Sequence, residues 1–117
     1  MSQKKRPDEV FNELKQYMGK VIRVARGRRG TTKQELADSL SRRFLWRLKE
    51  KEIELIETGK RQILFYEFQW ICIVLGYTQE IVLSVALFLR ANANKTLQEI
   101  EEEMIEQMEF DKYKESH

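Results

Sequence analysis

Apolar residues recur at helical spacing through residues 31–61, and two capping residues mark where the first helix of this stretch begins. Thr32 is followed three positions later by Glu35. This is the spacing of a capping box, in which the hydroxyl accepts the N–H of residue 35 and the carboxylate accepts the N–H of residue 32. The apolar positions that follow share one helical face: Leu36, Ala37 and Leu40. We therefore predict a helix from Lys33 to about Leu40.

A second helical run follows and stops at Gly59, a residue type that commonly ends helices. Its inward positions are Leu45, Leu48, Ile53 and Ile56. Because Phe44 and Leu45 already fit this stripe, we expect the second helix to begin early, near Arg42; the alternative is a lengthened turn. Two helices joined by a bend, with basic residues outward, are the parts of a helix-turn-helix.

The order of these residues resembles the XRE family, the lambda-repressor-like helix-turn-helix domains, over about residues 17–78. Three segments carry the resemblance: Thr32, Glu35, Leu36, Ala37 and Leu40; then Ile53, Ile56, Glu57, Gly59 and Arg61; then Leu75, Gly76 and Tyr77. The resemblance implies an all-α bundle of about five helices that binds DNA. It also implies that Glu57 is a buried acid paired with Arg23 or Arg26.

Two features depart from the family pattern. The chain is longer between Ala37 and Glu57, which is the region that joins the second and third helices. Lys33 stands where the family usually has a Gln that contacts phosphate, and Lys binds phosphate as a point charge.

The remaining periodicity predicts further helices at about 8–27, 64–75 and 79–92, and a last one that ends near Phe110. Thr96 and Glu99 have the spacing of a second capping box. The predicted organisation has four parts: a basic arm at 1–7, a helix-turn-helix domain at 8–78, a helical dimerisation segment at 79–112 and a frayed tail at 113–117.

Charge is distributed unevenly along the chain. Residues 1–61 hold 17 Lys and Arg against 9 Asp and Glu, whereas residues 62–117 hold 4 against 10. A basic half indicates a surface that meets a polyanion. Charge complementarity between subunits or domains is the alternative interpretation.

The candidate DNA-binding residues are all in the basic half: Arg28, Arg29, Thr32, Lys33, Arg42, Arg43, Arg47, Lys49, Lys51, Lys60 and Arg61. We assign phosphate contacts to Lys33, Arg28, Arg29, Lys60 and Arg61, and base reading to Arg43, Arg47, Lys49 and Lys51. The acids Glu50, Glu52 and Glu54 leave a second interpretation open, a solvated face with internal pairs such as Arg47 with Glu50. Trp46 is expected to pack in a core or an interface.

Residues 79–92 are apolar nearly all round, and the last predicted helix carries an apolar stripe on an acidic background. We favour a subunit interface for both, with a fold back onto the same chain as the alternative. The candidate interface residues are Ile81, Val85, Phe88, Leu89, Leu97, Ile100, Met104 and Met108.

The sequence offers little for catalysis. The single His is residue 117, the single Cys is residue 72, and no Gly-rich phosphate loop is present. We expect no enzyme activity, no metal and no cofactor. The longest apolar run, Ile81–Leu89, is too short to span a bilayer. A lone Cys favours a cytoplasmic protein.

The function expected from these features is that of a homodimeric, sequence-specific transcription regulator, most simply a repressor. Two copies would bind an inverted-repeat operator in double-stranded DNA, with half-sites ~34 Å apart. The alternative is a protein-binding adaptor or antitoxin-like module that grips another protein through residues 79–110.

Overall fold

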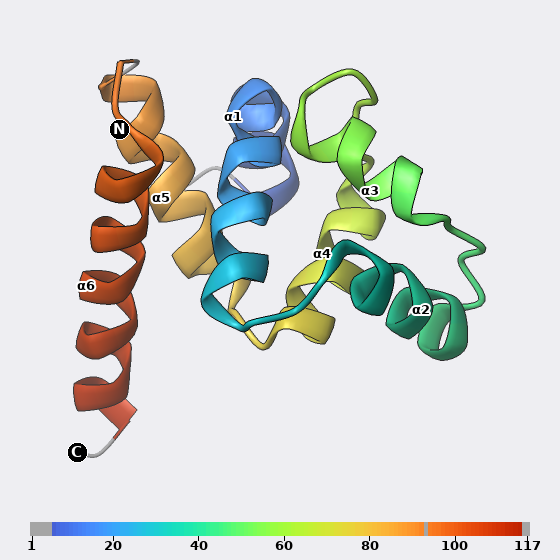
Figure 1. Cartoon of the computed structure of the whole chain (residues 1–117). Helices are drawn as coiled ribbons and strands as arrows, with labels where there is room; N and C mark the ends of the chain where they lie inside the picture. The colour runs from blue at the N-terminus through green and yellow to red at the C-terminus, as the bar shows by residue number, and fades with distance from the viewer. Residues whose placement is uncertain (1–5, 93, 116–117) are drawn as a thin grey trace.

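The structure is a computed structural model that describes residues 6–92 and 94–115, with side chains except at 97 and 108–115. The described part contains six helices and no strand, so the all-α prediction is confirmed (Figure 1). The helices are α1 (Pro7–Arg28), α2 (Lys33–Phe44), α3 (Glu50–Glu57), α4 (Phe65–Leu75), α5 (Gln79–Ala91) and α6 (Leu97–Glu115).

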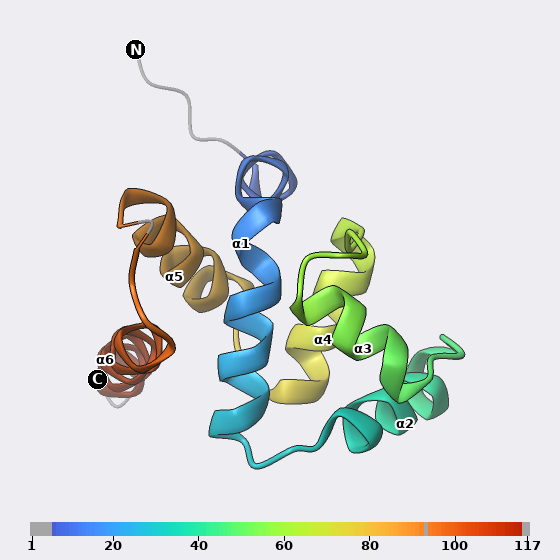
Figure 2. The same cartoon turned by 45° about the horizontal axis from the view of Figure 1, so that its top comes forward.

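Helix α1 runs through the middle of the molecule. It contacts α5 and α6 on one side and α3 and α4 on the other, and α2 packs against α3 and α4 (Figure 2). Phe11 of α1 is fully buried and stacks on Phe68 of α4, with ring centroids 5.0 Å apart. Burial of each such aromatic side chain stabilises the fold by about 1.5–3 kcal/mol. The buried residues of α1 also include Leu14, Met18 and Ile22.

The prediction for the first helix of residues 31–61 is confirmed at its start and too short at its end. The Glu35 N–H donates to Thr32 Oγ1 at 3.0 Å, and the Thr32 N–H donates to Glu35 Oε1 at 2.9 Å. The helix then continues past Leu40 to Phe44, where Leu45 ends it with a left-handed backbone, φ 56°.

The predicted early start of the next helix near Arg42 is wrong. Helix α3 begins at Glu50, and residues 45–49 form an irregular connection. The reason is tertiary, because Phe44 and Trp46 both pack on Trp70 of α4, with ring centroids 5.1 and 5.8 Å away. Residues 42–49 therefore form the end of α2 and the connection, not the start of α3.

Helices α5 and α6 pack on their own chain, which corrects our preference for a subunit interface. Ile81, Val85, Leu89, Ile100 and Met104 are buried among α1, α5 and α6, and Phe88 is half-buried. The fold-back alternative describes this conformation. The side chains of Leu97 and Met108 lie outside the described residues.

The two ends of the chain differ slightly from the predicted boundaries. Pro7 and Asp8 lie in the first turn of α1, and predicted-arm residues 1–5 lie outside the described residues. Helix α6 continues to Glu115, beyond the predicted end near Phe110. At its start the Glu99 N–H donates to Thr96 Oγ1 at 3.2 Å, which is one half of the predicted capping box.

Within the described residues no single helix is long and apolar enough to cross a membrane. By length and composition α4 and α5 meet that test only as a pair, which is bent by 111°.

Candidate nucleic-acid interface

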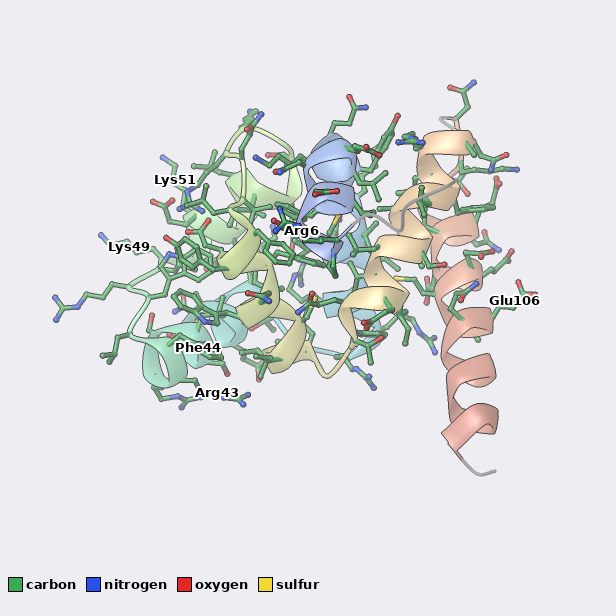
Figure 3. The ribbon with its side chains drawn as sticks, turned by 180° about the vertical axis from the view of Figure 1, so that it is seen from behind. Arg6, Arg43, Phe44, Lys49, Lys51 and Glu106 are labelled. Carbon is green, nitrogen blue, oxygen red and sulfur yellow. The ribbon has the colours of Figure 1, made fainter. Side chains whose placement is uncertain are left out.

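Exposed cations gather where α2 ends and α3 begins. We call this surface the α2–α3 basic edge, and it consists of Arg42, Arg43, Arg47, Lys49 and Lys51, all exposed. Figure 3 shows Arg43, Lys49 and Lys51 along one border of the molecule and Glu106 of α6 at the opposite border. Among the described residues none of the five forms an ion pair, so the Arg47–Glu50 pair of the alternative interpretation does not form there.

The elements that carry the basic edge differ from the prediction. Arg42 and Arg43 belong to the last turn of α2, Arg47 and Lys49 to the connection, and only Lys51 to α3. The predicted placement of all base-reading residues on one helix is therefore wrong, because the connection replaces the first turns of that helix.

The connection is held in place by its short-range contacts. The Ser41 hydroxyl donates to the Trp46 carbonyl at 2.9 Å, and Ser41 Oγ accepts the Leu48 N–H at 3.3 Å. Tyr66 packs edge-on against Trp70, the ring on which Phe44 and Trp46 rest. The prediction that Trp46 packs in a core or an interface is confirmed. These contacts orient the basic edge before any ligand binds.

The amino-terminal end of α2 adds a second candidate contact for phosphate. Free N–H groups and the positive end of the helix dipole are located there. Lys33 is in the first turn and reaches Glu54 of α3 at 3.4 Å. The Thr32 hydroxyl already accepts the Glu35 N–H in the capping box. The Thr32 N–H, which donates to the Glu35 carboxylate, lowers the pKa of Glu35 below its usual value.

Several predicted DNA contacts have intramolecular partners in this structure. Arg29 donates to the carbonyls of Leu75 and Gly76 at 2.7 and 2.8 Å and stacks on Tyr77, so it caps the end of α4. Arg28 pairs with Glu101 of α6 at 3.5 Å. Lys60 is exposed just after α3.

Arg61 is also engaged inside the molecule. Its guanidinium lies 3.2 Å from Glu67 and 3.6 Å from Glu52, and it covers the ring of Trp46. Glu67 is buried at the start of α4 and accepts the Leu64 N–H at 2.9 Å. Arg61 therefore ties α3, α4 and the connection together.

The pair that the family resemblance implied is present. Arg26 donates to both carboxylate oxygens of Glu57 at 2.7 and 2.9 Å, and the Glu57 side chain is buried. Hydrogen bonding to Glu57 raises the pKa of Arg26. Arg26 also donates to the Thr31 carbonyl at 3.0 Å, so the pair joins α1, α3 and the entry to α2.

Helix α3 presents mixed charge outward. Glu50 and Glu54 are exposed, as Lys51 is, and Glu52 is half-buried next to Arg61. An acid directed at phosphate is repulsive, whereas Glu accepts a hydrogen bond from cytosine N4. The electrostatic attraction for a polyanion therefore comes from α2 and the connection, and α3 contributes Lys51 alone at its first turn.

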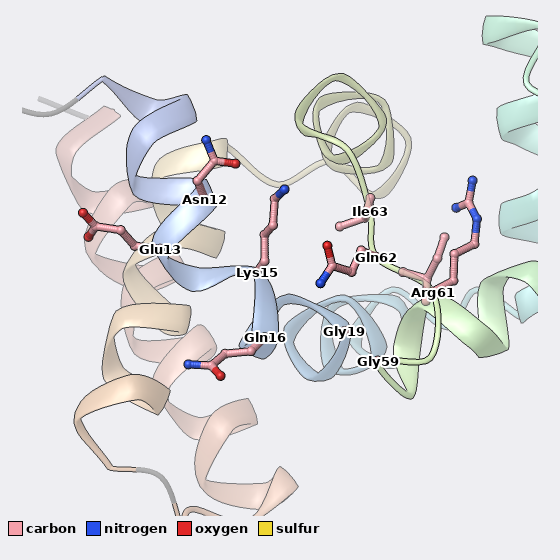
Figure 4. Close-up of a pocket in the computed structure, with 10 residues that line it drawn as sticks. Asn12, Glu13, Lys15, Gln16, Gly19, Gly59, Arg61, Gln62 and Ile63 are labelled. Carbon is pink, nitrogen blue, oxygen red and sulfur yellow. The ribbon is translucent and has the colours of Figure 1, made fainter.

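Sequence reasoning missed a polar hollow of about 370 Å³ between α1 and residues 59–63. Asn12, Lys15 and Gln62 border it, whereas the Arg61 guanidinium is directed away from it (Figure 4). A neighbouring hollow is bordered by Lys20 and Arg23. The signal in the sequence was the set of cations on α1 that lie outside its apolar stripe.

The described part of the chain holds no cluster of three or more His, Cys, Asp or Glu side chains that could bind a metal ion. Cys72 is buried, and burial, followed by the charge of Glu80, raises its pKa to about 12. A thiol in that state is a poor nucleophile at neutral pH.

Comparison with protein-family models, with characterised proteins and with solved structures finds no match to this chain.

Proposed function

We propose that this protein binds double-stranded DNA through the α2–α3 basic edge and acts as a sequence-specific transcription regulator. The observation that carries the proposal is the group of five exposed cations at the end of α2, in the connection and at the start of α3, without acid partners among the described residues. Like charges held close together repel one another, and a row of phosphates relieves that repulsion while counterions are released from the DNA.

The family resemblance supports the proposal independently of the charges. It assigns α2 and α3 to a helix-turn-helix, and the Arg26–Glu57 pair lies where the resemblance implied. In this motif the start of the second helix approaches the major groove. Lys51 and Glu50 are then the base-edge candidates, while Arg42, Arg43, Arg47 and Lys49 contact the backbone.

The proposed regulator binds as two copies on an inverted repeat, with half-sites ~34 Å apart. The apolar residues of α5 and α6 are buried within one chain. A pair of copies therefore needs another surface, and the measured solution mass of the free protein and of the DNA complex decides whether two copies bind.

The test is a salt titration of binding to duplex DNA with the variant Arg42→Gln/Arg43→Gln/Arg47→Gln. The affinity of the wild type should fall steeply with salt. In the variant, the slope of log affinity against log salt should shrink by about 0.9 for each phosphate that the protein no longer neutralises. Fluorescence anisotropy of a labelled duplex measures both.

Arg90→Gln is the matched control, because Arg90 is an exposed cation of α5 that pairs only weakly with Glu13, at 3.4 Å. It should leave the slope unchanged. Selection of bound duplexes from a random pool then reports sequence preference. Weak binding that ignores both salt and sequence refutes the proposal.

Protein binding is the second candidate, and an exposed apolar surface favours it. Tyr66 and Ile73, seven residues apart and therefore on the same side of α4, are 50% and 52% exposed. Exposed apolar patches of this kind mark interaction surfaces. A stoichiometric protein partner together with no retardation of DNA at low salt would favour this function over the first.

A further inference from the structure

Leu45 combines two unfavourable features at the centre of the basic edge. Its side chain is 85% exposed, and it is the one non-glycine residue with positive φ, 56°, among the described residues. Glycine or asparagine adopts this helix-ending conformation at lower cost than a leucine. A single exposed leucine is common, but an exposed leucine in a left-handed conformation carries two costs that a smaller residue avoids.

The flanking residues hold Leu45 outward. Phe44 and Trp46 on either side both turn inward onto Trp70, and the two hydrogen bonds of Ser41 fix the backbone that follows. Leu45 is thus the apolar tip of a preorganised connection, with little of its surface covered by its own chain.

Cations flank this tip along the chain. Arg42 and Arg43 precede it and Arg47 and Lys49 follow it, all exposed and without ion pairs within the described residues. The ligand that suits such a surface is anionic at its rim and apolar inside. Duplex DNA has this construction, because phosphates line both edges of the minor groove and stacked base pairs lie between them.

We propose that Leu45 inserts between two adjacent base pairs of duplex DNA from the minor groove, partly unstacks them and bends the duplex. The four flanking cations would hold the phosphates on both sides of the step. Pyrimidine–purine steps such as TA unstack most easily and are the expected sites. This inference rests on the proposed function and names the way in which the basic edge engages DNA.

The experiment uses a duplex with 2-aminopurine at a central TA step, because the fluorescence of this base rises when it is unstacked. Anisotropy of a separate terminal label reports binding, and every comparison is made at protein concentrations that saturate the duplex. The wild type and Leu45→Met, which keeps an apolar side chain, should both raise the fluorescence. Leu45→Asn, which tolerates the left-handed backbone, should lose that rise.

Two outcomes overturn the inference while leaving DNA binding intact. One is a saturated wild-type complex without a fluorescence rise, and the other is an equal rise with Leu45→Asn. If the wild type binds no duplex at low salt, the proposed function itself fails. The inference is also overturned if, in the absence of DNA, the wild type is a dimer and Leu45→Asn is a monomer. Leu45 would then contact a second copy of the chain.

Discussion

Single residues in this chain connect elements that are far apart in sequence. Arg26 and Glu57 form a two-bond ion pair whose side chains are 15% and 2% exposed. Exposed pairs such as Arg28 with Glu101 are solvated on both sides and contribute little. When one partner of a buried pair is removed, the other charge stays buried without compensation.

We therefore expect Arg26→Met to lower the free energy of unfolding by about 3 kcal/mol, since it leaves Glu57 buried and unpaired. Urea denaturation measures the change. Arg28→Met, which removes an exposed pair, should cost less than about 1 kcal/mol. Similar losses in the two variants would contradict the structural role given to Arg26.

The arginine side of this pair should respond only to strongly alkaline pH. Hydrogen bonding to Glu57 raises the pKa of Arg26, so the contribution of its charge is fully present below the usual arginine value and is lost as the pH rises through the raised, folded one.

At the scale of helices, the approach of α1 to α3 depends on one glycine. A Cβ at Gly19 would collide with the Ile56 carbonyl oxygen and lie 2.8 Å from the Glu57 carbonyl oxygen. Both atoms are backbone, so the helices themselves would have to move apart. Gly27 is also in α1, but a Cβ there meets nothing within 4 Å.

Gly19→Ala should destabilise the protein by about 1–3 kcal/mol through overpacking. Gly27→Ala should stabilise it by about 0.5–1 kcal/mol, because alanine has the better helix propensity and no contact is disturbed. Thermal or urea unfolding of both variants measures the loss of stability in one and the gain in the other. A gain in stability from Gly19→Ala would show that α1 and α3 do not approach each other as described.

The capping box of α2 should make this helix sensitive to acid. Hydrogen bonding from Thr32 lowers the pKa of Glu35 from its usual 4.5. The stabilising contribution is therefore present above that usual value and is lost as the pH falls through the lower, folded one. Stability should decline below about pH 4.5 in the wild type.

Glu35→Gln should show a smaller decline over the same pH range, when the free energy of unfolding is measured at several pH values. Glu99 also has a lowered pKa, chiefly through Lys95, and supplies a second part of the decline. The free energy of unfolding of the double variant Glu35→Gln/Glu99→Gln should therefore depend even less on pH. An unchanged pH profile in the single variant would exclude the capping box as a source.

Over the whole molecule, charge is separated along one axis. The basic edge and the acidic helix α6 lie at opposite ends, with α1 between them (Figures 1 and 3). Helix α6 contacts α1 and α5 and buries Ile100 and Met104 completely. Under the proposed function, this separation of charge would orient the basic edge towards DNA.

Met104→Ala should cost about 2–5 kcal/mol, because it leaves a cavity between α6 and its neighbours. If α6 packs on its own chain, the unfolding midpoints of wild type and variant should not depend on protein concentration. Midpoints that rise with concentration would show instead that this packing joins two copies. Glu106→Ala, at an exposed position of α6, is the matched control and should have little effect.

The features that could be predicted from the sequence depend on neighbours along the chain. The Thr32–Glu35 capping box is set by four consecutive residues, and the six helical segments follow from the spacing of apolar residues. The Arg26–Glu57 pair was expected from the family resemblance. The separation of charge between the two halves is also a property of the sequence.

Other features were decided by contacts between distant residues, which local patterns do not encode. The end of α2 depends on Trp70 of α4, since its ring draws Phe44 and Trp46 inward and leaves Leu45 outside. Periodicity alone fits those residues equally well to one long helix. Apolar stripes on α5 and α6 specify burial but not the partner, because the hydrophobic effect is non-directional; only the packing around α1 shows that the partner is the same chain.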